Sequence, residues 1–314
     1  MRVLIIGGSK FIGLHTTREL VGRGHQVTIV NRGLTKSSIP IPESVERIAA
    51  DLRNRKEFIQ RLGRCRWEVA MDFILQSTDL PDFIDYFNGN VRQYIHCSSC
   101  GVYVPMGRVP ARETDPPGNV KGLTFLEKLA QERVCLEAHT GRGFPTTIIR
   151  PTLVNGAGLI SLDAWGGRDI RFFKRLKRGE PVTVLNDGRA LVQPVSVRDL
   201  AWLFATAAEQ PRAVGQVYNG TSAQAVTLTE YARLLIEVFG GGSPIDYAPV
   251  EELIARHGAT GKINAAGARF LVEHAASDIH KAEAELDYHP AVDARGTLED
   301  SRQWMEENGL LAEG

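Results

Sequence analysis

Residues 2–13 read RVLIIGGSKFIG, and this stretch decides the fold. Val3–Ile6 are apolar and mostly branched, which is typical of a strand buried on both faces. Gly7 and Gly8 permit a tight turn, and Gly13 lets the next helix pack closely on the strand. Backbone N–H groups at such a helix start point at a phosphate, so the stretch predicts a dinucleotide site. A glycine-rich turn alone is weak evidence, because many loops need glycine only for positive φ.

The sequence after this turn supports the prediction. A helical segment, Leu14–Gly22, is followed by a second apolar strand, Gln26–Val30, at the spacing of a right-handed βαβ unit. The strand ends at Asn31-Arg32, where the ribose of a dinucleotide would bind. We therefore expect an α/β protein with a doubly wound parallel sheet.

The turn GGSKFIG resembles the T-G-x-x-G-F-I-G turn of extended short-chain dehydrogenases/reductases, the NAD-dependent epimerase/dehydratase family. Ile6 stands at the usual threonine, and Lys10 at the usual middle glycine. An atypical subgroup with G-G-T-[RK]-F-I-G, which includes chloroplast stem-loop binding proteins, is more similar. The resemblance runs through nearly the whole chain. It implies a Rossmann domain over 1–155, to which part of 181–220 returns, and a smaller C-terminal α/β substrate lobe over 156–314.

The resemblance also implies a set of cofactor contacts. They are Gly7, Gly8, Ser9, Lys10, Phe11, Ile12 and Gly13 in the turn, Asn31 and Arg32 at the ribose, Asp51 and Leu52 at the adenine, and Phe73, Lys128 and Pro151 near the nicotinamide. Asp51 has an alternative role as the cap of a helix at Arg53–Leu62, and Phe73 has one in the core. An acidic residue at position 31 would repel a 2'-phosphate, but Asn31 is neutral and Arg32 and Lys10 are cationic, so NADP is the expected cofactor, with NAD as the alternative.

The expected catalytic residues depart from the family pattern. Ser99 matches the second serine of the S-S-x-x-V-Y segment, although a serine pair at a strand end also serves as a cap. On a helix predicted over Leu123–His139, Lys128 matches the lysine of Y-x-x-x-K, but Thr124 stands at the tyrosine. A threonine hydroxyl is far less acidic than a phenol, whose pKa is about 10, so it cannot simply substitute. Tyr103 is either a relocated donor that swings inward or a structural aromatic residue.

Two further departures concern the substrate. Leu153 and Val192 stand where sugar-nucleotide enzymes of the family have an asparagine and an arginine for the diphosphate. Neither side chain donates a hydrogen bond, so we expect a small-molecule substrate other than a nucleoside-diphosphate sugar. Arg189, or the basic helix around Arg171, is the alternative clamp for such a ligand.

Composition narrows the class of protein. The 314 residues include 37 basic and 37 acidic side chains, a net charge of +0, which disfavours nucleic-acid and membrane surfaces. No apolar run approaches the roughly 18 residues of a membrane span, and we expect a cytoplasmic protein. Cys97 and Cys100 form a lone C-x-x-C, and His280 and His289 have no partner at ligand spacing, so no metal site is expected.

The leading hypothesis is an NAD(P)-dependent oxidoreductase or epimerase-like enzyme acting on a small carbonyl or alcohol. The missing tyrosine motivates a second one, a non-catalytic NAD(P)-binding regulator. The subgroup resemblance adds a third, an RNA-binding protein of the same fold, against which the neutral charge and 7% aromatic content argue. The resemblance also allows a homodimer that pairs through helices at Pro81–Phe87 and Leu123–His139.

Overall fold

A computed structural model describes residues 1–34 and 37–312; in the loop expected at Gly33–Pro42, Thr35 and Lys36 lie outside the described residues. The main sheet has seven strands in the order β11-β6-β5-β4-β1-β2-β3. They are β1 (Arg2–Ile6), β2 (Gln26–Asn31), β3 (Glu46–Ala49), β4 (Val69–Asp72), β5 (Gln93–Cys97), β6 (Thr146–Pro151) and β11 (Val217–Gly220). All neighbouring strands pair in parallel. The predicted doubly wound α/β fold is confirmed.

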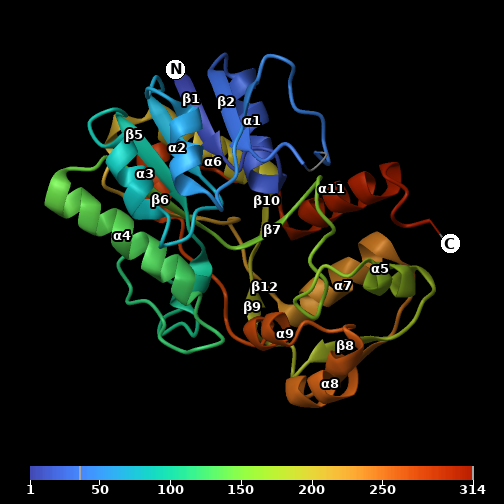
Figure 1. The fold of residues 1–314 in the computed structure, drawn as a ribbon. Helices are drawn as coiled ribbons and strands as arrows, with labels where there is room; N and C mark the ends of the chain where they lie inside the picture. Colours follow the sequence, from blue (N-terminus) through green and yellow to red (C-terminus); the bar gives the residue numbers. More distant parts are fainter. Residues whose placement is uncertain (35–36, 313–314) are drawn as a thin grey trace.

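Helices cover both faces of this sheet (Figure 1). One face carries α1 (Phe11–Gly22), α6 (Val197–Glu209) and α10 (His280–Leu286), and the other carries α2 (Arg55–Leu62), α3 (Leu80–Phe87) and α4 (Leu126–Arg142). The strands alternate apolar side chains between the two resulting cores: Val3 and Ile5 face one and Leu4 and Ile6 the other. The sheet is therefore buried on both faces, as expected from β1.

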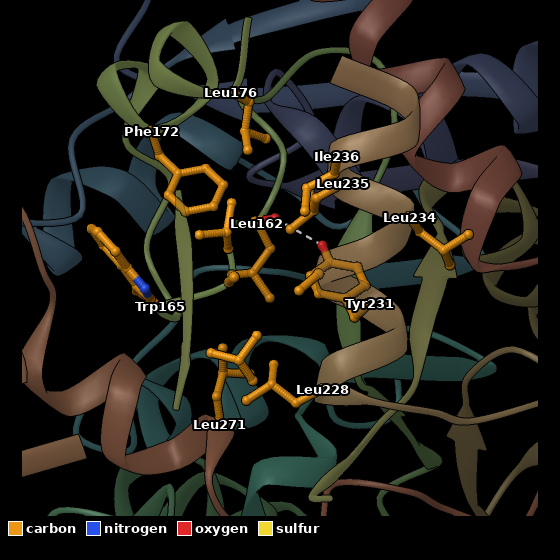
Figure 2. Close-up of a cluster of buried hydrophobic side chains, with 14 of the residues drawn as sticks. Leu162, Trp165, Phe172, Leu176, Leu228, Tyr231, Leu234, Leu235, Ile236 and Leu271 are labelled. Atoms are coloured by element: carbon orange, nitrogen blue, oxygen red, sulfur yellow. Dashed lines mark hydrogen bonds between the residues drawn. The ribbon is translucent and has the colours of Figure 1, made fainter. Parts of the chain in front are cut away.

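The smaller lobe has its own core. Its helices are α5 (Ile170–Lys177), α7 (Leu228–Phe239), α8 (Val250–His257), α9 (Ala265–Leu271) and α11 (Ala294–Glu307), and its sheet pairs β8 (Val182–Leu185) with β13 (Ile245–Ala248). Figure 2 shows Phe172, Leu176, Leu235 and Leu271 converging there, and the Tyr231 hydroxyl donating to the Leu162 carbonyl at 2.8 Å. The smaller lobe thus has a hydrophobic core that is separate from the two cores of the main sheet.

The resemblance implies that part of 181–220 returns to the Rossmann domain. β8 pairs inside the smaller lobe, and the return begins only with α6. Residues 279–288 also join the Rossmann core, through buried side chains such as Ala282 and Tyr288.

Two short ladders connect the lobes: β7 (Leu153–Asn155) pairs with β10 (Pro194–Ser196), and β9 (Leu191–Val192) with β12 (Val226–Thr227). Short 3-10 turns are η1 (Cys100–Tyr103), η2 (Pro211–Ala213) and η3 (Gly258–Thr260). Within 1–34 and 37–312, no helix combines the length and apolarity needed to cross a membrane.

The glycine turn has the close backbone packing expected from its sequence. Gly7 has φ +93°, and a Cβ on Gly13 would lie 2.4 Å from the carbonyl oxygen of Gly7. The next helix starts at Phe11, which has φ +38°, unusual for a residue with a side chain. The turn therefore depends on the absence of a side chain at Gly13.

We expect Gly13→Ala to destabilise the protein by about 1–3 kcal/mol, because its methyl group would overlap backbone rather than a flexible side chain. Gly22 is the matched control: it ends the same helix, and a Cβ there meets no atom within 4 Å. Gly22→Ala should be neutral or stabilising by up to about 1 kcal/mol. Urea unfolding measures both, and equal effects of the two substitutions would contradict the packing argument.

Candidate functional site

A pocket of about 350 Å³ lies at the carboxyl ends of the strands, beside the glycine turn. Its lining includes Gly7, Ser9 and Lys10 from the turn, Asn31 and Arg32 from the end of β2, Asp51 and Leu52 from the segment after β3, and Arg53 and Ile74. These elements are far apart in the sequence, and the parallel sheet brings their ends to one edge. The structure thus brings seven of the fourteen residues predicted to bind the cofactor into the lining of one pocket.

The pocket has the chemistry that a dinucleotide needs. The first amides of a helix have no acceptor within the helix, and in α1 these belong to the residues that follow Lys10. The helix dipole adds positive potential there. Phe11 and Ile12 face the other way, since both pack against a buried cluster that contains Val195 and Val197. The turn therefore presents backbone donors, with Lys10 exposed beside them.

The ribose end of the pocket is polar and cationic. The Asn31 side-chain oxygen accepts the Gly33 N–H at 2.7 Å, which orients its amide. Arg32 is exposed and lines the pocket together with Lys10. β2 ends at Asn31, which is neutral, so Arg32 and Lys10 give this part of the rim a positive charge.

Asp51 is held by Arg53, a pocket residue that the sequence reasoning missed. The Asp51 carboxylate accepts the Arg53 backbone N–H at 3.0 Å and the guanidinium at 2.5 and 2.9 Å. These hydrogen bonds lower the pKa of Asp51 to about 2, so the group is an anion at neutral pH. Asp51 does not cap α2, because Asn54 accepts the Glu57 N–H. Arg53 follows Asp51-Leu52 directly, which is the signal that could have identified it.

The end of β4 contributes Ile74 rather than Phe73 to the lining. The Phe73 ring packs against Phe204, with centroids 4.9 Å apart, and so belongs largely to the core. Ile74 is 44% exposed and lies against Gly7. Asp72 holds this turn, since its Oδ1 accepts the N–H groups of Ile74 and Leu75 at 2.9 and 2.7 Å. Phe73, which was expected near the nicotinamide, therefore lies mainly in the core, and Ile74 takes the place in the pocket lining.

Asp72 also forms a buried pair with His96 on β5. The Asp72 Oδ2 and His96 Nδ1 are 2.7 Å apart, and both side chains are almost fully buried. Burial raises the pKa of Asp72, but the hydrogen bond and charge of His96 outweigh it and leave that pKa below its usual range. A charged residue inside the apolar strand VAMD was the visible signal for this pair.

Ser99 follows β5, and the Lys128 side chain reaches the end of the same strand from α4. The Ser99 hydroxyl accepts the Gly101 N–H at 3.0 Å and lies 3.5 Å from the Pro151 carbonyl oxygen. It therefore caps η1 while it stays at the end of β5. Lys128 donates to the Cys97 carbonyl at 2.7 Å. Its ammonium group therefore contacts the backbone two residues before Ser99. The structure groups three predicted site residues, Ser99, Lys128 and Pro151.

The other two predicted catalytic residues do not face this group. Thr124 is buried and its hydroxyl donates to the Val104 carbonyl at 2.5 Å, so it shapes a turn before α4, which begins at Leu126 rather than at Leu123. Tyr103 is 2% exposed and donates to the Asn219 side chain at 2.9 Å. Burial raises the pKa of Tyr103. The catalytic role for Thr124 is corrected, and Tyr103 takes the structural alternative.

A buried ion pair lies behind the site. Arg150 on β6 donates to both oxygens of Glu132 on α4, at 2.8 and 2.6 Å. Glu132 also accepts from the Ser98 hydroxyl, and Arg150 donates to the Tyr103 hydroxyl. Every charged atom of the pair thus has polar partners, which offsets much of the cost of burial. Glu132 lies one helical turn after Lys128 and matches the K-L-x-x-E continuation of the family motif.

The residues weighed for a diphosphate are not arranged around one. Val192 is fully buried, and Leu153 packs against the core of the smaller lobe. The Arg189 side chain is 87% exposed and lies 3.7 Å from Asp187. Arg171 pairs with Asp169 at 2.7 Å. These positions do not form a phosphate clamp in the structure.

Cysteine and histidine chemistry finds little support. Cys97 and Cys100 are buried free thiols, and burial raises the pKa of each to about 12. His280 and His289 are exposed and pair with Asp278 and Asp287. Within the part of the chain that the structure describes, no group of three or more His, Cys, Asp or Glu side chains is placed to hold a metal ion.

Comparison with known proteins gives consistent matches. The model of the NAD dependent epimerase/dehydratase family matches residues 3–74 and 74–219. The chloroplast stem-loop binding protein of 41 kDa b from Arabidopsis thaliana is 29% identical over 96% of this chain and 78% of that protein. UDP-N-acetyl-alpha-D-glucosaminuronate decarboxylase from Bacillus cytotoxicus is 26% identical over 98% of both. An epimerase structure from Methanothermobacter thermautotrophicus superposes with a TM-score of 0.79 at 22% identity, covering 98% of this chain and 92% of that one.

We expect Glu132→Gln to cost about 3–5 kcal/mol of unfolding free energy, because it leaves the Arg150 guanidinium buried without a counter-charge. Glu306→Gln is the matched control, since Glu306 pairs with Arg302 on the exposed face of α11. Its cost should be below about 1 kcal/mol. Urea unfolding of both variants at pH 7 makes the comparison, and similar small losses would show that the buried pair is dispensable.

Asp72→Asn should make stability less sensitive to acid. The folded-state pKa of Asp72 is lowered, so the stabilisation from its charged form is complete above the unfolded value of about 3.9 and is lost as pH falls through the folded value. The stability difference between the wild type and the variant should therefore shrink from pH 5 to pH 3, below the titration of an ordinary histidine. Urea unfolding across this range tests it; a constant difference would be the contrary result.

Proposed function

Because the chain belongs to the NAD dependent epimerase/dehydratase family, we propose that it is an NAD(P)-dependent oxidoreductase or epimerase-like enzyme acting on a small carbonyl or alcohol. One observation carries this proposal: the glycine-turn pocket, Lys128 and Ser99 all lie at the carboxyl edge of the main sheet. A phosphate site, a cation and a hydroxyl on one edge suit a nucleotide cofactor with a reacting group beside it.

We propose NADP as the cofactor. The amides at the start of α1 would hold the pyrophosphate, the Asp51 carboxylate would accept from the adenine amine, and Arg32 and Lys10 would bind a 2'-phosphate. When bound, the nicotinamide supplies the hydride donor or acceptor. Lys128 is placed to bind the ribose beside it. Both rim cations are exposed and lie on the pocket that holds Asn31, so the charge there suits a phosphate better than a bare hydroxyl.

We propose that proton transfer in this site is slow or uses a donor other than tyrosine. Ser99 would hold the substrate oxygen by a hydrogen bond, and Lys128 would stabilise negative charge near it. Neither group is a neutral phenol, and Thr124 and Tyr103 are held in other contacts. A positioned general acid contributes about a hundred- to ten-thousand-fold, so its loss should appear in the rate rather than in cofactor binding.

We propose that the substrate is not a nucleoside-diphosphate sugar, despite the sugar-nucleotide enzymes among the relatives. A diphosphate needs charge-assisted donors to offset its desolvation. At the two matched positions stand Leu153 and Val192, and both contribute to packing. Arg189, the other residue considered for this role, is exposed and pairs with Asp187 instead.

A nucleotide-binding protein without hydride chemistry is the second candidate, favoured by the inward-turned Thr124 hydroxyl. RNA binding belongs to this candidate, because of the stem-loop binding protein among the relatives. NADPH consumption with a panel of aldehydes and ketones, and RNA gel shifts at physiological salt, separate the candidates. Carbonyl-dependent NADPH consumption supports the enzyme; an RNA shift without consumption supports the alternative.

We expect Arg32→Ala to weaken NADPH binding by about 10- to 100-fold, the effect of one charge-assisted hydrogen bond. NADH binding should change by less than about threefold, because NADH lacks the 2'-phosphate. Arg233→Ala on the exposed face of α7 is the control and should change neither. Calorimetric titration measures all three proteins. Tighter binding of NADH than of NADPH by the wild type would refute the cofactor assignment.

A further inference from the structure

Two phenylalanines from different lobes meet beside the strand edge just described. Phe125 immediately precedes α4, and Phe270 lies on α9. Their ring centroids are 5.2 Å apart, with the planes inclined by 39°. Phe125 is nevertheless 43% exposed, so much of its ring remains in water. Leu126 beside it is also 41% exposed, and adjoining exposed apolar side chains are typical of a ligand or partner contact.

The position of Phe125 relates it directly to Ser99 and Lys128. Its ring lies over Gly101, where a Cβ would come within 2.7 Å of the ring atoms. The Gly101 N–H donates a hydrogen bond to the Ser99 hydroxyl. The Gly101 carbonyl in turn accepts the Phe125 N–H at 3.1 Å. Lys128 follows on the same helix. The ring thus covers the turn that carries the proposed substrate-binding hydroxyl.

Phe270 is fixed from the other side. A Cβ on Gly267 of α9 would lie 2.1 Å from the Gly166 carbonyl oxygen, so α9 is packed backbone to backbone against the loop that follows β7. Phe270 itself packs against the core of the smaller lobe. The aromatic contact therefore joins a rigid element of the smaller lobe to the edge of the Rossmann domain.

Apolar exposure continues along this edge. Leu126 is 41% exposed, beside Phe125, and Ile74 is exposed on the cofactor side. The loop after Ile74 is held close to α4, because the Ser77 N–H donates to Glu127 at 2.7 Å. Apolar side chains thus border the site on two sides, which would disfavour a strongly hydrated, charged ligand.

We propose that Phe125 and Phe270 determine substrate specificity by forming an aromatic wall for a flat, uncharged carbonyl compound. This inference rests on the proposed function, since it takes Ser99 as the group that holds the carbonyl oxygen. The ligand stacks on the exposed face of Phe125 and packs against Phe270, and its oxygen lies toward Ser99. Aromatic rings stack favourably in offset and tilted arrangements, and the existing pair already has such a geometry.

Binding of three probes by calorimetry tests the proposal, with and without saturating NADP⁺. The probes are trans-cinnamaldehyde, which is flat and apolar, glycolaldehyde, which is small and polar, and UDP-glucose. The variants are Phe125→Ala, Phe270→Ala and Gly101→Ala. The last keeps both rings but places a methyl group where the Phe125 ring lies, and the φ of Gly101 is outside the left-handed region. Tyr247→Ala, which removes another half-exposed aromatic side chain on β13, is the matched control.

We expect the wild type to bind cinnamaldehyde more tightly than glycolaldehyde or UDP-glucose, and each of the three variants to lose about tenfold or more of that affinity. Tyr247→Ala should bind as the wild type does. NADP⁺ affinity should stay within about threefold throughout, which separates loss of the wall from loss of the fold.

Three results would overturn the proposal: wild-type preference for glycolaldehyde or UDP-glucose, unchanged cinnamaldehyde affinity in the three variants, or an equal loss in Tyr247→Ala. Failure of NADP⁺ to bind the wild type counts against the proposed function instead. In that event the titrations without NADP⁺ still decide the wall: variant-sensitive cinnamaldehyde binding supports it, and variant-insensitive or absent binding rejects it.

Discussion

The buried pair of Arg150 and Glu132 is the interaction on which the site depends. It joins β6 to α4 by two hydrogen bonds and is extended by Ser98 at the end of β5. Because Lys128 lies one turn before Glu132, fixing this helix also fixes the Lys128 ammonium against the Cys97 carbonyl. Without the pair, α4 would be held to the sheet mainly by apolar contacts, which do not set the position of a charge so narrowly.

The same network engages the hydroxyl group of Tyr103, one of the two residues considered as substitute proton donors. The Tyr103 hydroxyl lies between Arg150 and Asn219, so it is committed to the support of the ion pair. The position of the family tyrosine is occupied by Thr124, whose hydroxyl satisfies the Val104 carbonyl in the turn before α4. Both candidate donors are thus used to build the edge. What remains accessible is a cation and a serine, which suits binding better than fast proton transfer.

Sequence reasoning predicted the sheet well, and seven of the residues expected at a cofactor line one pocket at its carboxyl edge, since both follow from local patterns. Buried strands ending in Gly7 or Asn31 define where a parallel sheet presents its carboxyl ends. It did not predict contacts that arise only when distant segments meet: β8 pairs with β13, which lies about sixty residues later in the chain. The Asp72–His96 pair, and Phe125 with Phe270, are likewise products of tertiary packing. A local pattern identifies the end of a strand but does not specify what lies opposite it.

Positive charge is available to a ligand at the glycine-turn pocket more than in the smaller lobe. In the smaller lobe several cations are used internally: Arg168 donates to the Ile160 and Val154 carbonyls, Arg171 pairs with Asp169, and Arg175 lies over Trp165. At the cofactor rim, by contrast, Lys10 and Arg32 are exposed on the pocket. An anionic ligand group is therefore attracted to the glycine turn, and near Phe125 the cation is Lys128, which donates to the Cys97 carbonyl. If the proposed cofactor occupies the pocket, its phosphates lie at the glycine turn, and Lys128 is the cation left beside Ser99 for a substrate oxygen.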